Sequence, residues 1–120
     1  MLTIYPSSSF LNRIKFAIPF IWGVLGFFAA VGPLALNPQN LAWLDSGDLA
    51  LNHFGWALFR FSPWDFPIGL NPWASLDVAS SIVYTDSIPI FSVFFKLLSF
   101  ALPDPFQYLG IWYLICFLLQ

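Results

Sequence analysis

Long apolar runs separated by short polar segments dominate the chain. Residues 16–36 carry no charge and no strongly polar side chain. At 1.5 Å per residue this run forms about 32 Å of helix, enough to cross the hydrocarbon core of a bilayer. The pattern predicts a transmembrane helix over residues 16–36. A cleaved signal peptide is the alternative, but the run is too long for one and no A-x-A cleavage site follows.

The basic residues predict the orientation of this helix. Arg13 and Lys15 precede it, and the next basic residue is Arg60. The positive-inside rule therefore places residues 1–15 in the cytoplasm. Residues 37–86 then form an extracytoplasmic loop.

An amphipathic helix is expected near residues 46–61, at the start of this loop. On a helical wheel one arc is apolar and consists of Ala50, Leu51, Phe54, Ala57, Leu58 and Phe61. The opposite arc carries the polar residues Asp48, Asn52, His53 and Arg60. A wide apolar arc with many aromatic side chains is typical of a helix that lies in the membrane interface.

A second interfacial or re-entrant helix is expected over residues 87–102. This apolar segment contains one polar stripe, because Ser92, Lys96 and Ser99 recur at i, i+4 and i+7. Its apolar part gives only about 22 Å of helix, which is short for a span. A central lysine in hydrocarbon would cost roughly 3 kcal/mol. A genuine crossing is the alternative.

Residues 106–120 begin another apolar segment after the break at Pro103-Asp104-Pro105. We expect the start of a second transmembrane helix here, truncated at Gln120, because a helix that ends inside a bilayer leaves backbone groups without partners. The expected fold class is an all-α membrane protein. It combines an N-terminal transmembrane helix, an extracytoplasmic loop with amphipathic interfacial helices, and a truncated second transmembrane helix.

Composition agrees with this interpretation and excludes one class of partner. Of the 120 residues, 59% are hydrophobic and 8% are charged, against about 25% charged in soluble domains. The net charge is −2 and the few basic residues are scattered, so no nucleic-acid partner is expected. Membrane lipid is the expected partner.

The candidate chemistry lies on the polar arc of the 46–61 helix. The Asp48 carboxylate could act as a general base toward a hydroxyl or hold a divalent cation. An arginine or histidine nearby could hold a phosphate. Each group also has a structural explanation: Asp48 complements the helix macrodipole, His53 is a polar-face residue, and Arg60 anchors the helix to lipid phosphates.

Four motifs in the chain resemble a known family. They are GD…H-x-G-W-x-x-F-R, W-x-F-P, TDSIP and FQY-x-G-x-W, and the resemblance runs from about Phe20 to Gln120. The chain resembles the N-terminal region of an uncharacterised family of bacterial polytopic membrane proteins that is grouped with the GT-C glycosyltransferases. The resemblance implies a multi-pass protein of the bacterial inner membrane that uses a polyprenyl-phosphate sugar donor.

The resemblance also implies roles for individual residues. In GT-C enzymes an acid near the start of the first outer loop deprotonates the acceptor or assists a metal ion. The matching position is Asp48, with Asp45 a weaker candidate. His53, Arg60, Asn52 and Trp56 are the expected substrate-binding residues. The D-x-D motif of some relatives is absent, so no metal ligands are predicted, and a divalent cation is the only cofactor considered.

The sequence therefore predicts the N-terminal part of a GT-C-like glycosyltransferase, inactive as a fragment, that transfers a sugar to an envelope acceptor. Two alternatives stay open. One is a non-catalytic polytopic protein of envelope polysaccharide assembly or transport. The other is a small two-span membrane adaptor.

Overall fold

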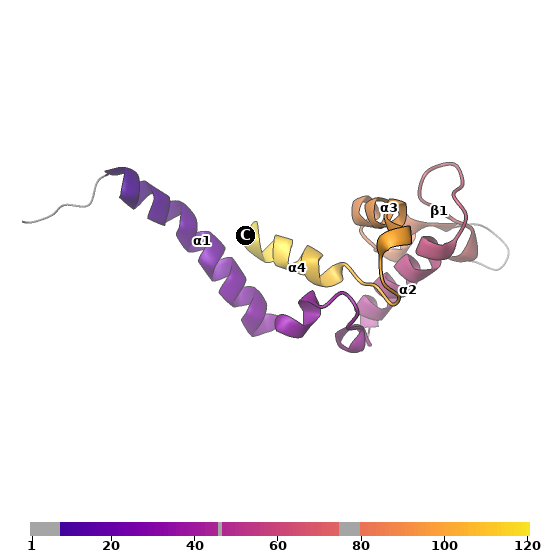
Figure 1. Ribbon diagram of the computed structural model, residues 1–120, viewed down its shortest axis with the longest axis horizontal. Coiled ribbons are helices and arrows are strands. Elements are labelled where there is room, and N and C mark those ends of the chain that lie inside the picture. Colours follow the sequence, from indigo (N-terminus) through magenta and orange to yellow (C-terminus); the bar gives the residue numbers. More distant parts are fainter. Residues whose placement is uncertain (1–7, 46, 75–79) are drawn as a thin grey trace, which may run out of the picture. The chain divides into compact units, whose positions relative to one another are not determined.

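The computed structural model describes residues 8–45, 47–74 and 80–120, which are mostly helical (Figure 1). They belong to two compact units. Unit 1 combines Met1–Asn37 with Leu109–Gln120, and unit 2 is Pro38–Tyr108. Unit 1 is formed by two segments that are far apart in the sequence, whereas unit 2 is one continuous segment.

Unit 1 is a pair of packed helices with a short 3₁₀ turn. Its elements are α1 (Ser8–Ala30), η1 (Pro33–Leu36) and α4 (Leu109–Leu118). The helix α1 ends where Gly32 adopts a φ of 91°, which glycine tolerates, and where Pro33 has no N–H to continue the helix.

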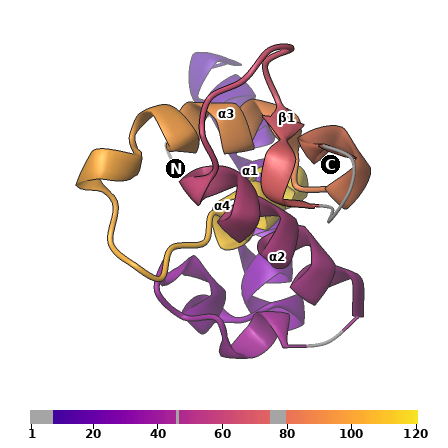
Figure 2. The same cartoon turned by 90° about the vertical axis from the view of Figure 1, so that its right-hand side faces the viewer.

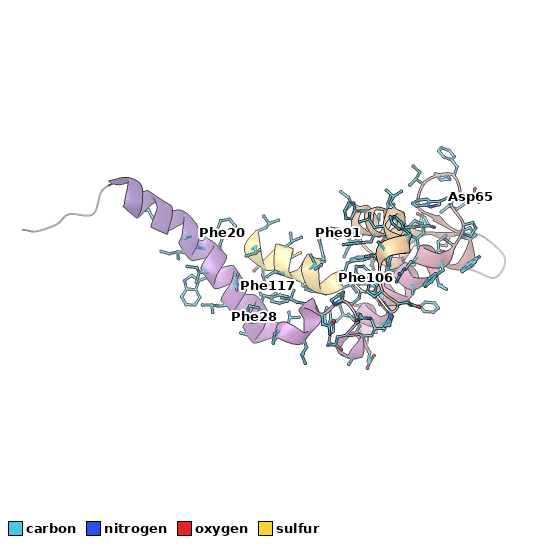
Figure 3. All side chains as sticks on the ribbon, in the orientation of Figure 1. Phe20, Phe28, Asp65, Phe91, Phe106 and Phe117 are labelled. Carbon is cyan, nitrogen blue, oxygen red and sulfur yellow. The ribbon has the colours of Figure 1, made fainter. Side chains whose placement is uncertain are left out.

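Glycines allow α4 to approach its neighbours closely. A Cβ atom at Gly23 of α1 would overlap the carbonyl oxygen of Phe117, and one at Gly110 of α4 would overlap the carbonyl oxygen of Ala35. The ring of Phe117, labelled on α4 in Figure 3, meets the ring of Phe27 edge-on. Their centroids are 6.0 Å apart. Backbone proximity and an aromatic contact therefore hold the helix pair together.

The predicted transmembrane helices, and with them the predicted all-α membrane fold, are wrong. Among the described residues, no helix combines the length and the apolar character that crossing a membrane requires. Residues 16–36 are not one helix: α1 begins at Ser8 and ends at Ala30, so its first turns include the polar residues Ser8, Ser9, Asn12, Arg13 and Lys15. The helix α4 has 10 residues, or about 15 Å. A small β-sheet is also present.

The described part of unit 2 contains two α-helices, a two-stranded sheet and several 3₁₀ turns. Its helices α2 and α3 and its strand β1 are labelled in Figure 2. In chain order its elements are η2 (Ala42–Leu44), α2 (Gly47–Phe61), β1 (Leu70–Asn71), η3 (Pro72–Ala74), β2 (Ser80–Ser81), η4 (Ile82–Thr85), α3 (Pro89–Leu97) and η5 (Ser99–Ala101). The strands are antiparallel, and Leu70 pairs with Ser81. The amphipathic helix expected near residues 46–61 corresponds to α2, and residue 46 lies outside the described residues.

The core of unit 2 lies beneath α2. Trp56 and Phe59 are buried there, together with Ile82 and the segment before α4 that contains Phe106 and Tyr108. The Trp56 and Tyr108 rings meet edge-on at 5.1 Å. Because α2 is in contact with η4, β1 and α3, it positions most of the unit, including every residue predicted to bind substrate.

Candidate functional site

A groove of about 400 Å³ runs beside the N-terminal half of α2. Its apolar lining consists of Leu41, Leu44, Ala50, Phe54 and Ala57, and its polar lining consists of Asp45 and His53. This volume falls within the range of small-molecule sites, which combine apolar walls with a few polar groups. The groove exists because η2 packs against α2.

His53 is the unusual group in this groove. Its side chain is half-buried, and its Nδ1 atom is buried without a hydrogen-bond partner among the described residues. Burial lowers the pKa of His53 below its usual value, because removing the imidazolium from water is unfavourable. At neutral pH the ring is therefore neutral, and one of its nitrogens can accept a proton.

The two acids at the start of α2 differ in position. Asp45 follows η2 and lines the groove together with His53. Asp48 lies in the first turn of α2, is exposed, and is not part of the groove lining. The structure thus brings the weaker candidate, Asp45, into the same groove as His53, and it leaves Asp48 on the solvent side of the helix.

Asn52 contributes to the internal structure of unit 2. In the orientation that its neighbours require, its side-chain amide nitrogen donates to the backbone carbonyl oxygens of Thr85 at 3.1 Å and Asp48 at 3.2 Å. The backbone carbonyl oxygen of Asn52 accepts a hydrogen bond from the Ser87 hydroxyl at 2.6 Å. These contacts fix the N-terminal half of α2 against the η4 segment.

Trp56 is a core residue in this structure. Its side chain is 2% exposed, and its indole Nε1 donates to the carbonyl oxygen of Phe106 at 2.9 Å. A ring in this position packs against Tyr108 and Phe106. It therefore offers no open face on which a sugar could stack.

Arg60 is directed into unit 2. Its Nη1 donates to the carbonyl oxygen of Pro103 at 2.9 Å, and its Nη2 donates to that of Leu102 at 3.0 Å. The exposed carboxylate of Asp104 lies 3.9 Å from Nη1. The guanidinium thus binds the backbone segment that follows η5, since carbonyls at the end of a helical segment lack partners of their own.

Lys96 is a second buried cation, which the sequence placed only in a polar stripe. Its Nζ donates to the Ser62 hydroxyl at 3.0 Å and to the Pro63 carbonyl at 3.3 Å. It also lies 4.0 Å from the ring centre of Phe59 and 4.6 Å from that of Trp64. Burial lowers the pKa of Lys96, while the aromatic faces stabilise its charge. Nothing in the sequence alone identifies these partners.

Metal ligands do not gather in the described part of the chain. Within residues 8–45, 47–74 and 80–120, no three histidine, cysteine, aspartate or glutamate side chains lie close enough to hold a metal ion. The groove offers the pair Asp45 and His53.

Comparison with protein-family models gives a match over most of the chain. A family model described as a domain of unknown function (DUF6311) matches residues 20–120. No curated protein and no solved structure matches the chain.

Proposed function

The chain belongs to the family of this domain of unknown function, DUF6311, and we propose that it is the N-terminal part of a GT-C-like glycosyltransferase. In this proposal the full protein works at the bacterial inner membrane. It transfers a sugar from a polyprenyl-phosphate donor to an envelope acceptor. The motifs that resemble GT-C-like proteins support the proposal, and they lie within the matched residues.

The groove beside α2 is the observation that carries the proposal. A polyprenyl-phosphate sugar joins a hydrocarbon chain to a polar head, and the groove has the same division. Leu41, Leu44 and Phe54 offer apolar walls, whereas Asp45 and His53 offer polar atoms. In the proposed complex the hydrocarbon lies along the walls, and the sugar hydroxyls lie at these two side chains.

Sugar transfer needs a group that takes a proton from the acceptor hydroxyl. The hydroxyl oxygen bonds to the anomeric carbon of the sugar while the bond from that carbon to the donor phosphate breaks. The resemblance assigns the proton to Asp48, which is exposed and free to meet an acceptor. The groove favours Asp45 or the neutral His53, and the experiment below separates the three.

A second candidate is a non-catalytic protein of envelope polysaccharide assembly or transport. The burial of both basic residues of unit 2 favours this candidate. Arg60 binds internal carbonyl groups and Lys96 binds Ser62 and Pro63, so neither is directed toward a donor phosphate. Under this candidate the groove would bind a lipid-linked sugar without transferring it.

The test is sugar transfer by the full-length protein in lipid, measured with a labelled polyprenyl-phosphate sugar. Asp45→Asn, Asp48→Asn and His53→Gln are compared with Asp86→Asn. Asp86 is exposed at a φ of 51°, a conformation that asparagine also tolerates, so this control should fold and react normally.

We expect one of the three groove or helix variants to lose about 10²–10⁴-fold in turnover, the usual contribution of a general base. If the unaltered protein binds the donor but does not transfer the sugar, the result would contradict the glycosyltransferase proposal and favour the non-catalytic candidate. Absence of both binding and transfer would overturn both.

A further inference from the structure

The helix α3 presents three large apolar side chains outward and two polar side chains inward, while its half-buried Phe91 and Phe95 rings stack on Tyr108. Ile90, Phe94 and Leu97 recur at i, i+4 and i+7, and they are 75%, 55% and 62% exposed. Ser92 and Lys96 lie on the opposite side and are buried. A helix at a water-exposed surface has the reverse arrangement, because its apolar stripe faces the core.

The inward polar groups of α3 are satisfied within unit 2. The Ser92 hydroxyl donates to the carbonyl oxygen of Ser87 at 2.5 Å and lies 2.6 Å from the Tyr108 hydroxyl. Lys96 binds Ser62 and Pro63. A helix whose outer side contacts a medium that cannot form hydrogen bonds needs its polar side chains to find their hydrogen-bond partners within the protein.

The outer face of α3 is also hollowed. Ile90, Phe91 and Phe94 alone line an open depression of about 240 Å³. No polar side chain lines it, so it offers nothing to a headgroup, a sugar or a phosphate. Its chemistry matches hydrocarbon.

The distribution of charge in unit 2 indicates which kind of surface contacts the outer face of α3. Both basic residues of the unit, Arg60 and Lys96, are buried. The exposed acids of its described part are Asp45, Asp48, Asp65, Asp86 and Asp104. Helices that bind anionic lipid carry lysine or arginine beside their apolar face. Here the exposed charged side chains are negative, so they repel anionic lipid headgroups. The surface that complements the outer face of α3 is therefore the hydrocarbon of a lipid layer without net charge.

We propose that the outer face of α3, formed by Ile90, Phe94 and Leu97, inserts into the acyl region of a zwitterionic lipid monolayer. The helix lies along the layer and Lys96 remains inside unit 2. This inference deepens the membrane location in the proposed function but does not depend on sugar transfer, and its test contains no transfer step.

The test measures which medium surrounds position 94. In the full-length protein with Cys116→Ser, a fluorescent label is attached at Phe94→Cys or at Asp48→Cys, a matched helical position on the exposed side of α2. Each protein is reconstituted into phosphatidylcholine vesicles. Quenching by doxyl groups on the acyl chains is compared with quenching by aqueous iodide.

We expect the label at position 94 to be quenched by the acyl-chain doxyl groups and shielded from iodide, and the label at position 48 to show the reverse. Iodide quenching at position 94 equal to that at position 48 would overturn the proposal. Protection of position 94 from both quenchers would also overturn it, since protein would then cover the face.

Two further measurements test the chemistry of the contact. Ile90→Ser combined with Leu97→Ser should lower doxyl quenching at position 94 at least about threefold, whereas Val83→Ser, an exposed apolar site outside α3, should leave it unchanged. Replacing a third of the lipid by phosphatidylglycerol should leave the quenching equal or lower. A clear increase with anionic lipid would contradict the charge argument.

Discussion

The indole nitrogen of Trp56 donates a 2.9 Å hydrogen bond to the carbonyl oxygen of Phe106, fifty positions further along the chain. Both side chains are buried, and their rings meet edge-on at a centroid distance of 6.3 Å. One residue of α2 therefore binds both the backbone and the side chain of the segment that ends unit 2.

Replacing Trp56 by phenylalanine should lower the free energy of unfolding by about 1–3 kcal/mol, because the Phe106 carbonyl loses its buried donor. Trp73→Phe is the matched control, since Trp73 is exposed, and it should change stability by less than about 0.5 kcal/mol. Denaturant unfolding of both variants measures the difference. Equal effects would mean that the bond to Phe106 contributes nothing.

Arg60 and Asp104 should differ sharply when each is substituted. Arg60→Ala removes the donors to the Leu102 and Pro103 carbonyls and should cost about 3 kcal/mol of stability. Asp104→Asn removes only an exposed charge at 3.9 Å and should cost less than about 0.5 kcal/mol. Thermal unfolding of both variants provides the comparison. An Arg60→Ala protein as stable as the unaltered protein would contradict the structural role of Arg60.

Gly23 and Gly26 lie about one turn apart on α1, so alanine substitutions at the two positions can be compared directly. Alanine at either position should gain about 1 kcal/mol of helix propensity. At position 23 the new methyl group overlaps backbone atoms of Phe117 and should cost about 1–3 kcal/mol, whereas at position 26 it meets only the Phe117 ring at 3.3 Å. Hydrogen exchange of the α4 amides should therefore accelerate in Gly23→Ala and not in Gly26→Ala. The same rates in both variants would contradict the close helix contact.

The stability of unit 2 should fall as the pH drops below the ordinary pKa of histidine. Burial lowers the pKa of His53 in the folded state, so the unfolded chain takes up a proton first and is favoured below about pH 6.5. The stability that depends on a neutral His53 is therefore fully present above about pH 6.5, and it is lost as the pH falls toward the pKa of His53 in the folded state. Unfolding midpoints from pH 7.5 to 5.5 should decline in the unaltered protein and decline less in His53→Gln. His53 is the only histidine, so its NMR titration reports the pKa directly.

The helical period of residues 46–61 was visible in the sequence, but the environment of each side chain was not. The polar arc contained Asn52, His53 and Arg60, which suggested one water-facing surface. In the structure the Arg60 guanidinium turns inward, because its carbonyl partners at Leu102 and Pro103 come from a segment about forty residues away. Periodicity reports which residues share a face, and it contains no information about such distant acceptors.

The error in the first apolar run has a local cause. The hydropathy of residues 16–36 predicts one helix, but the run contains Gly32 and Pro33. The positive φ of Gly32 ends α1 before the apolar run does. Hydropathy measures the preference of side chains for an apolar medium, while the length of a helix depends on backbone geometry.

Gly55 occupies a position in α2 where the backbone touches the Thr85 side chain, and an added Cβ would overlap both the Cβ and the Oγ1 of that threonine. In evolution, substitutions at positions 55 and 85 therefore depend on each other. A larger residue at position 55 requires a smaller residue at position 85. The smaller residue would lack the Thr85 hydroxyl, which lies 2.8 Å from the Ser87 hydroxyl. Homologous sequences should therefore either keep glycine at this position or vary both positions together.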